Sequence, residues 1–176
     1  MSGLGHLAPG LVAKSTAPKV PLWVFLLVGE TNDLLYFAFT AIGIEKPAAI
    51  TMDFNQGVRY LTQGSIPWSH GFFMSVVWSV LAAGIALLFW RDRRVSFLLG
   101  IVVFSHWALD FLMHFNLPLF FDGSPLVGLG LENSGQGFLF ITIFDIVILA
   151  AGIAVYFRAK SAGGTPSRAE GGKSEL

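Results

Sequence analysis

Four apolar stretches, each about as long as a membrane-spanning helix, constrain this chain more than any other feature. They cover residues 21–44, 68–90, 95–114 and 138–157. A helix needs roughly 20 mostly apolar residues to cross a bilayer. Of the 176 residues, 54% are hydrophobic and 12% are charged, whereas a soluble domain carries about 25% charged residues. We therefore expect an all-α membrane protein with four transmembrane helices.

The two ends of the chain differ from these stretches in composition. Residues 1–19 are rich in Gly, Ala, Pro and Ser, and residues 161–176 are polar and low in complexity. Segments of this kind bury too little apolar surface to fold by themselves. We expect a disordered N-terminal tail over 1–19, a four-helix transmembrane domain over 20–160, and a disordered C-terminal tail over 161–176.

The distribution of Lys and Arg predicts the orientation in the membrane. Cytoplasmic loops carry an excess of these residues. We therefore expect the N- and C-termini on the cytoplasmic side of the cell inner membrane, and the long loops 45–67 and 115–137 on the outer side. The cytoplasmic side would carry Lys14, Lys19, Arg91, Arg93, Arg94, Arg158 and Lys160, and the outer side Lys46 and Arg59.

Three ionisable side chains form a stripe on the third apolar stretch. His106, Asp110 and His114 are spaced i, i+4 and i+8, which places them along one face of a helix. Ionisable groups inside a membrane are costly and usually mark a functional site. The stripe therefore predicts a polar site within the helices.

Other ionisable residues are expected at a similar depth. Glu30 and Asp33 lie in the first stretch, His70 lies at the outer start of the second, and Asp145 lies in the fourth. All of them fall near mid-membrane or in the outer half. We expect a polar pocket that opens outward and that gathers residues from several helices.

Histidine and carboxylate groups suit Zn²⁺ and similar divalent ions. His106 and His114 are about 12 Å apart along a helix axis, too far for one ion to bind both together with Asp110. Two arrangements stay open: two of the three bind one ion with His70 or a carboxylate of the first helix, or Asp110 lies between two ions. Asp33 or Glu30 would then act as a ligand, as a partner of a ligand, or as a catalytic base.

Each of these residues also has a structural interpretation. His70 and His114 suit the membrane interface, with Ser69 as a helix cap before His70, and His106 suits a hydrogen bond to a neighbouring helix. Asp110 would pair with one of the histidines. In that case the polar residues only hold helices together, and single alanine substitutions would have mild effects.

Several runs carry a resemblance to a known family. They include Asn-Asp-Leu-Leu at 32–35, Pro-Trp-Ser-His at 67–70 and Ser-His-Trp-Ala-Leu-Asp at 105–110, followed by His114. Gly-Ile-Glu at 43–45, Leu-Pro-Leu at 117–119 and a Gly-Leu-Gly-Leu run within 128–134 complete the pattern. In these runs the chain resembles the small bacterial proteins grouped as membrane-bound metal-dependent hydrolase-like, which include the LexA-regulated inner-membrane protein.

The resemblance covers roughly residues 25–157 and implies metal-dependent hydrolysis. The chain departs from one branch of this family after His114, where Phe115 and Asn116 replace the expected Arg-Pro-Asp. It also has Glu132 where that branch has Trp.

Three functions therefore remain open at this stage. The first is a hydrolase that acts on a lipid-like phosphate or ester at the outer membrane boundary, with membrane lipid as its partner. The second is a non-enzymatic protein that handles protons or ions or is a subunit of a larger complex; with four helices it would need a homo-oligomer or a membrane partner. The third is a structural role. A formal net charge of zero argues against nucleic acid, and the lack of cysteine excludes thiolate metal sites.

Overall fold

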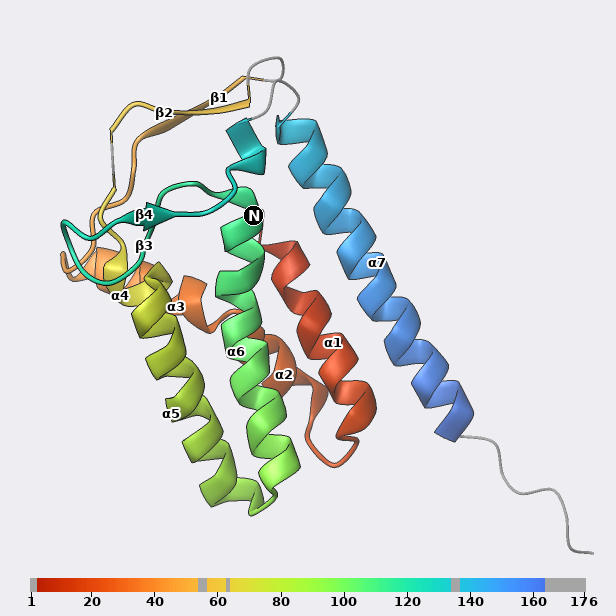
Figure 1. Ribbon diagram of the computed structural model, residues 1–176. Coiled ribbons are helices and arrows are strands. Elements are labelled where there is room, and N and C mark those ends of the chain that lie inside the picture. Colours follow the sequence, from red (N-terminus) through yellow and green to blue (C-terminus); the bar gives the residue numbers. More distant parts are fainter. Residues whose placement is uncertain (1–2, 54–56, 63, 134–136, 164–176) are drawn as a thin grey trace, which may run out of the picture.

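The computed structural model describes residues 3–53, 57–62, 64–133 and 137–163 and is mostly helical (Figure 1). Helices are joined by short turns at one end of the molecule and by two long loops at the other. The helices are η1 (Leu4–His6), α1 (Leu7–Thr16), α2 (Leu22–Gly29), α3 (Thr31–Ala41), α4 (Pro67–His70), α5 (Phe72–Trp90), α6 (Arg93–Met113), η2 (Leu131–Asn133) and α7 (Gly137–Gly163). The strands are β1 (Ile50–Asp53), β2 (Gly57–Tyr60), β3 (Leu117–Pro118) and β4 (Leu126–Val127).

Three helices, α5, α6 and α7, are long and apolar enough to cross a membrane. The first apolar stretch forms a fourth candidate, but as the pair α2 and α3, bent by 53°. The break falls at Gly29 and Glu30, where a glycine and a charged residue interrupt the apolar run. The expectation of an all-α chain is thus confirmed, and three to four of its helices are long and apolar enough to cross a membrane.

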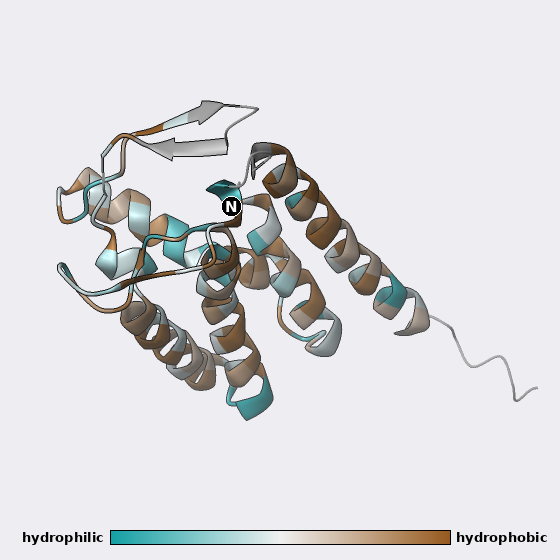
Figure 2. Ribbon diagram, turned by 45° about the horizontal axis from the view of Figure 1, so that its top comes forward, coloured by the Kyte–Doolittle hydropathy of each residue, from teal (hydrophilic) through white to brown (hydrophobic). Residues whose placement is uncertain are grey.

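The outer surfaces of these helices are apolar. Leu88 and Phe89 on α5 are both 78% exposed, and hydrophobic residues cover much of α5, α6 and α7 (Figure 2). A protein surrounded by water rarely shows so much contiguous apolar surface. These helix faces therefore suit contact with lipid tails.

The prediction of a disordered tail over residues 1–19 is wrong for most of that segment. Residues 7–16 form α1, which packs against both α2 and α7 (Figure 1). A Cβ added to Gly10 would lie 2.7 Å from the Phe25 carbonyl oxygen, and one added to Gly152 would lie 3.0 Å from the Ala8 Cα. Small residues allow backbones to approach this closely inside a membrane protein. Packing, which composition does not reveal, thus stabilises a helix with little propensity of its own.

The two ends of the described chain lie at different ends of the bundle. Gly3 lies beside Asp33, since its missing Cβ would be 4.0 Å from an oxygen of that carboxylate. The end of α7 lies toward the α5–α6 turn instead (Figure 1). The cytoplasmic location expected for both termini stays a prediction. The predicted C-terminal tail from residue 164 onward lies outside the described residues, and α7 extends to Gly163.

The α5–α6 turn is tight. Arg91 adopts a left-handed conformation with φ 50°, and Asp92 caps α6 by accepting hydrogen bonds from the backbone N–H groups of Arg94 and Val95. A buried apolar cluster lies along α6 beyond this turn, with Val95, Leu99 and Val102 packed against Phe25 of α2. This cluster separates the turn from the polar residues farther along α6.

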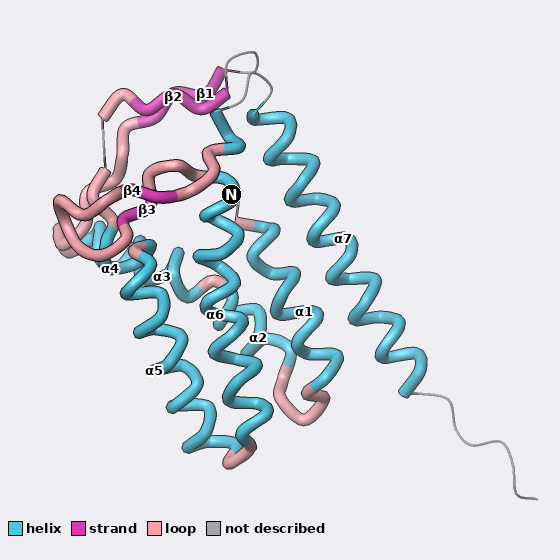
Figure 3. Tube along the Cα trace, in the orientation of Figure 1, coloured by secondary structure: helices cyan, strands magenta, loops and turns pink. Residues whose placement is uncertain are grey.

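Two antiparallel hairpins lie at the opposite end of the helices (Figure 3). In one, β1 pairs with β2 with Ile50 opposite Tyr60, and in the other, β3 pairs with β4 with Leu117 opposite Val127. Both belong to the long loops 45–67 and 115–137. They form a layer over the ends of the helices where the polar side chains gather.

Candidate metal centre

The Asp110 carboxylate, near the C-terminal end of α6, is the centre of the polar site. The chain contains four histidines, and each places its Nε2 atom within 3.5 Å of this carboxylate. They come from η1, from α4, from α6 and from the residue that ends α6. The Nε2 distances are 3.3 Å for His6 and 3.5 Å for His114 to Oδ1, and 3.4 Å for both His70 and His106 to Oδ2.

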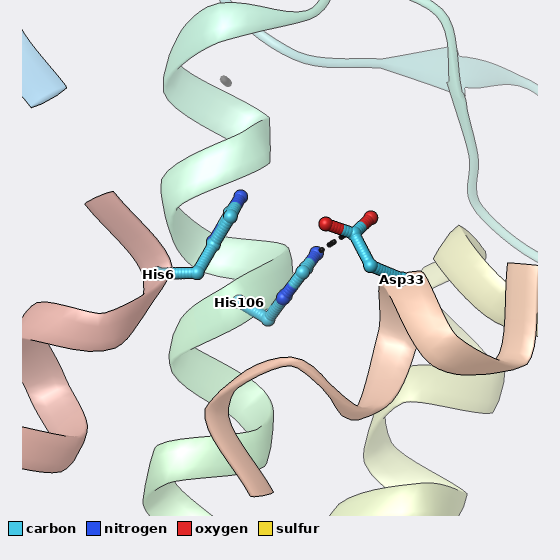
Figure 4. Close-up of side chains that lie close together, drawn as sticks. All are labelled: His6, Asp33 and His106. Atoms are coloured by element: carbon cyan, nitrogen blue, oxygen red, sulfur yellow. Dashed lines mark ion pairs between the residues drawn. The ribbon is translucent and has the colours of Figure 1, made fainter. Parts of the chain in front are cut away.

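A second carboxylate, Asp33 on α3, faces two of the same histidines. Its Oδ1 atom lies 3.3 Å from Nε2 of His70 and 3.5 Å from Nε2 of His106. Figure 4 shows His6, His106 and Asp33 converging from three separate segments. The bend between α2 and α3 therefore brings a carboxylate of the first apolar stretch onto the stripe of α6.

The site is buried at its centre and accessible at one edge. Asp110, His6 and His106 are each at most 2% exposed. The side chains of Asp33 and His114 are 31% and 24% exposed. The two carboxylates and four imidazoles thus form one continuous cluster that reaches from the protein interior to its surface.

The Nδ1 atom of His106 is 2.8 Å from the carbonyl oxygen of Gly29. A carbonyl oxygen can only accept a hydrogen bond, so Nδ1 carries the proton and donates it. In the neutral imidazole, Nε2 then has the free lone pair. The lone pair of His106 therefore points at the two carboxylates.

His70 is held in the same tautomer by a chain of two residues. Ser69 Oγ donates to Glu45 Oε2 at 2.6 Å, and His70 Nδ1 lies 2.8 Å from Ser69 Oγ. Because the Ser69 proton is used toward Glu45, the Ser69 oxygen accepts from His70. Glu45 is only 2% exposed and also accepts from the backbone N–H groups of Trp68 and Ser69, both at 2.8 Å.

A hydrogen bond to a carboxylate fixes the orientation of the His114 ring. Its Nδ1 atom lies 2.8 Å from Glu132 Oε1, in the loop layer. A hydrogen bond from Nδ1 to a carboxylate or carbonyl oxygen is the usual arrangement of histidines that bind metal through Nε2. His106 and His114 have such a partner, and His70 has the Ser69 hydroxyl oxygen in that place.

These tautomers fit a cation between the side chains. Without one, Nε2 must carry a proton instead, because a nitrogen lone pair facing negatively charged oxygens at a buried position is unfavourable. His106 Nε2 is buried and makes no hydrogen bond. Two groups of ligand atoms lie close enough to share an ion, His6 with Asp33 and His106, and His70 with His106 and Asp110. The buried cluster could therefore hold a metal ion.

His6 and His114 both lie outside the candidate membrane spans and differ in their pKa values. Burial lowers the pKa of His6 and outweighs the attraction of Asp110, so this imidazole is neutral at pH 7. Burial also acts to lower the pKa of His114, but its hydrogen bonds to Asp110 and Glu132 outweigh that effect and raise the pKa to about 9.

A cavity of about 200 Å³ opens onto the exposed edge of the cluster. Asp33, His70 and His114 form part of its wall. The other lining residues are Tyr36, Ala48, Ile50, Gly64, Ile66, Asn116 and Leu117. The cavity lies between the helices and the loop layer, so a small molecule bound there would touch both the polar cluster and apolar side chains.

Five of the six residues predicted for the site come together in the structure: Asp33, His70, His106, Asp110 and His114. Glu30 lies at the break between α2 and α3, and its buried Oε1 atom makes no hydrogen bond. Among the described residues, neither group of potential ligands includes Glu30 or the buried Asp145 of α7.

Sequence reasoning missed His6, and it gave no supporting role to Glu45 and Glu132. His6 was assigned to a tail because its neighbours are small residues. The available signal was that the chain has only four histidines and that one of them directly precedes an apolar run. No protein-family model, curated protein or solved structure matches this chain.

Proposed function

We propose that this protein is an integral protein of the cell inner membrane that hydrolyses a lipid-like phosphate or ester with the help of a divalent metal ion. The observation that carries the proposal is the arrangement around Asp110. Buried histidines, oriented by acceptors at Nδ1, present Nε2 to two carboxylates beside a cavity. The proposal agrees with the resemblance to metal-dependent membrane hydrolases.

In this proposal the bent pair α2–α3 and the helices α5, α6 and α7 cross the membrane, with the Arg91–Arg94 turn on the cytoplasmic side. The 10-residue helix α1 is about 15 Å long, half of a hydrocarbon core of about 30 Å. It would run from the depth of the site toward the cytoplasmic side and bring Lys14 there. The cluster and the loop layer then belong to the outer half.

His70, His106, Asp110 and Asp33 would hold the ion, since the Nε2 atom of each of the two histidines lies 3.3–3.5 Å from an oxygen of each of the two carboxylates. Imidazole and carboxylate ligands suit Zn²⁺ or a similar divalent ion. When bound, such an ion lowers the pKa of a water molecule and polarises the bond to be broken. Gly29, Ser69 and Glu45 would keep the histidines in the tautomer that binds metal.

Asp33 contacts the histidines and also forms part of the cavity wall. Its second oxygen can accept a proton from a water molecule in the cavity. The water oxygen would bond to the phosphorus or acyl carbon of the substrate. The ester oxygen would leave and take up a proton, which gives an alcohol and a phosphate or carboxylate.

The cavity favours a substrate with a small polar group attached to an apolar one. Tyr36 and Asn116 offer hydrogen bonds, whereas Ile66 and Leu117 are apolar. None of the described residues that line it is Lys or Arg, so the charge of a phosphate would be compensated by the metal centre. A lipid headgroup at the outer boundary meets these requirements.

Proton transfer across the membrane is less well supported. A relay would need polar groups along the path between the site and the Arg91–Arg94 turn. The buried cluster in that part of the described structure consists of apolar residues, among them Val95, Leu99 and Val102. The polar residues gather instead at one depth, as in a binding site.

The proposal is tested with purified protein in mixed micelles. Phosphatidic acid and an isoprenyl phosphate serve as phosphate substrates, and a p-nitrophenyl ester serves as an acyl substrate. We expect turnover of at least one of them, its loss on chelation, and its return with Zn²⁺ or Mn²⁺. His106→Ala should reduce turnover at least about 100-fold, because loss of even an outer partner of a ligand costs 10–100-fold.

Asp122→Asn is the matched control, since Asp122 is exposed on the loop layer and lines no part of the cavity. It should retain normal turnover. A folded wild-type protein that binds no metal and turns over none of these compounds would overturn the proposal.

A further inference from the structure

The two oxygens of the Asp110 carboxylate face different pairs of histidines. Oδ2 faces His70 and His106, and Oδ1 faces His6 and His114. A carboxylate that presents one oxygen to each of two sets of ligands can bridge two ions, as in two-metal sites with ions about 3.5–4 Å apart. The division of partners between the two oxygens is the first observation.

The number of donors is the second observation. Four imidazole nitrogens and two carboxylates converge on the site. A zinc ion takes four ligands, and His70, His106, Asp110 and Asp33 already supply them. His6 and His114 would then be left without a function in a one-ion centre, although one is fully buried and the other is braced by Glu132.

Packing contacts hold His6 in a defined position. Its ring stacks on that of His106, with centroids 3.6 Å apart and planes 7° from parallel, and both rings point the same way (Figure 4). A Cβ added to Gly29 would lie 2.9 Å from the His6 backbone oxygen. The packing of α1 on α2 and α7 holds this segment in position. The N-terminal segment therefore contributes the His6 side chain to the cluster around Asp110.

His114 gives the second set of ligands access to the cavity. His114 and Asn116 both line the cavity wall, whereas His106 is fully buried. A centre with three protein ligands and one open position is typical of catalytic zinc. The Oδ1 side of Asp110 offers two histidines and one oxygen, and of these His114 lies on the cavity wall, which leaves a position for water or substrate on that side.

From these observations we infer that the site binds two divalent transition-metal ions bridged by Asp110. One ion is held by His70, His106 and Asp33, and the other by His6 and His114. The inference rests on the proposed metal-dependent function and deepens it, because both ions would then have a ligand on the cavity wall, Asp33 and His70 for the first and His114 for the second. The N-terminal segment is thereby part of the metal centre.

Metal stoichiometry tests the inference without an activity assay. The purified protein in detergent is stripped with chelator, titrated with Zn²⁺ alone and measured by elemental analysis after removal of free ion. We expect two ions per chain for the wild type, one for His6→Ala, one for His70→Ala, and none for Asp110→Asn. Asp122→Asn is the control and should bind two.

The outcomes separate the inference from the proposed function. One ion in the wild type, bound equally well by His6→Ala, would overturn the two-ion centre and leave the one-ion hydrolase intact. One ion in the wild type that His6→Ala loses would also overturn it, because His6 would then share a single ion with Asp33 and His106. No ion in the wild type would overturn both.

A spectroscopic measurement on the wild type covers the case in which a variant fails to fold. Protein loaded with Mn²⁺ should give the electron paramagnetic resonance spectrum of two spin-coupled ions, as expected for ions joined by one carboxylate. A spectrum of isolated Mn²⁺ only, at saturating metal, would contradict the bridge.

Discussion

His106 donates a hydrogen bond of 2.8 Å from Nδ1 to the carbonyl oxygen of Gly29, the last residue of α2 before the break to α3. The last carbonyl groups of a helix lack partners within the helix, so the break supplies an acceptor where the histidine needs one. Gly29 also allows the His6 backbone to approach closely. One residue thus positions two of the histidines around Asp110.

Gly29→Ala should weaken metal binding by displacing His6. The added Cβ would lie 2.9 Å from the His6 oxygen, so the N-terminal segment must shift while the Gly29 carbonyl remains. We expect the affinity of the more weakly held ion to fall at least about 10-fold, the scale of losing an outer partner. Isothermal titration with Zn²⁺ measures the change.

Gly84→Ala is the control for this substitution. A Cβ at Gly84 meets nothing within 4 Å, and the residue is exposed on α5. It should bind metal as the wild type does. Equal affinity of Gly29→Ala and the wild type would show that the close approach of His6 has no role in binding.

Glu132→Ala should lower metal affinity without unfolding the protein. Glu132 accepts from His114 Nδ1 and fixes the orientation of that ring. Loss of such a partner typically costs 10–100-fold in metal affinity. Glu132→Gln keeps an acceptor oxygen and should lose less, so the order wild type, Gln, Ala in Zn²⁺ affinity is the expected result; an Ala variant as tight as the wild type would contradict the role.

Glu45→Ala should lower the stability of the folded protein. The carboxylate accepts hydrogen bonds from Trp68 N, Ser69 N and Ser69 Oγ in a buried position. Each buried donor left without a partner costs about 1–3 kcal/mol. We expect a loss of at least about 2 kcal/mol, read as a lower Tm of the metal-free protein in detergent, and a further loss of metal affinity through His70.

Glu45→Gln is the informative companion, because its amide oxygen can still accept from the backbone. It should restore part of the Tm but not the full metal affinity. A Tm for Glu45→Ala within error of the wild type would mean that these three hydrogen bonds do not stabilise the α4 region.

Metal binding should strengthen as pH rises toward 9. His114 has a pKa of about 9 in the metal-free protein, above the usual 6.5, so its proton must leave when a metal binds at neutral pH. Each proton released changes the apparent affinity about tenfold per pH unit. Zn²⁺ titrations at several pH values should show this slope, and His114→Gln should flatten it.

The same shift has the opposite effect on the metal-free fold. A raised pKa means that protonated His114 stabilises the folded state below about pH 6.5 and that this contribution is lost as pH rises through about 9. The Tm of the metal-free protein should therefore fall over this range and that of the metal-loaded protein should not. A Tm independent of pH in the metal-free wild type would contradict the hydrogen-bonded state of His114.

The stripe on α6 could be predicted because it depends only on helix geometry. The spacing of His106, Asp110 and His114 placed them on one face, and the helix rise showed that one ion could not bind all three. The structure has contacts that suit both arrangements: His70 and Asp33 join the stripe, and the two Asp110 oxygens face separate partners.

The rest depended on contacts between distant residues. His6 reaches the site because Gly10 and Gly152 allow α1 to pack closely, which neither propensity nor hydrophobicity indicates. Glu45 and Glu132 lie in loops whose course is set by the hairpins above the helices. At the bend between α2 and α3, Gly29 and Glu30 interrupt the apolar run, but the 53° angle that brings Asp33 to the stripe could not be read from these two residues.

The most direct test of the metal centre is X-ray absorption at the metal edge of the purified protein, beside Asp110→Asn. We predict a shell of nitrogen and oxygen ligands at about 2.0–2.2 Å, with the scattering pattern of at least two imidazoles, and its loss in the variant. A metal with oxygen ligands only, or a spectrum unchanged by Asp110→Asn, would contradict the assignment of this cluster as the metal centre.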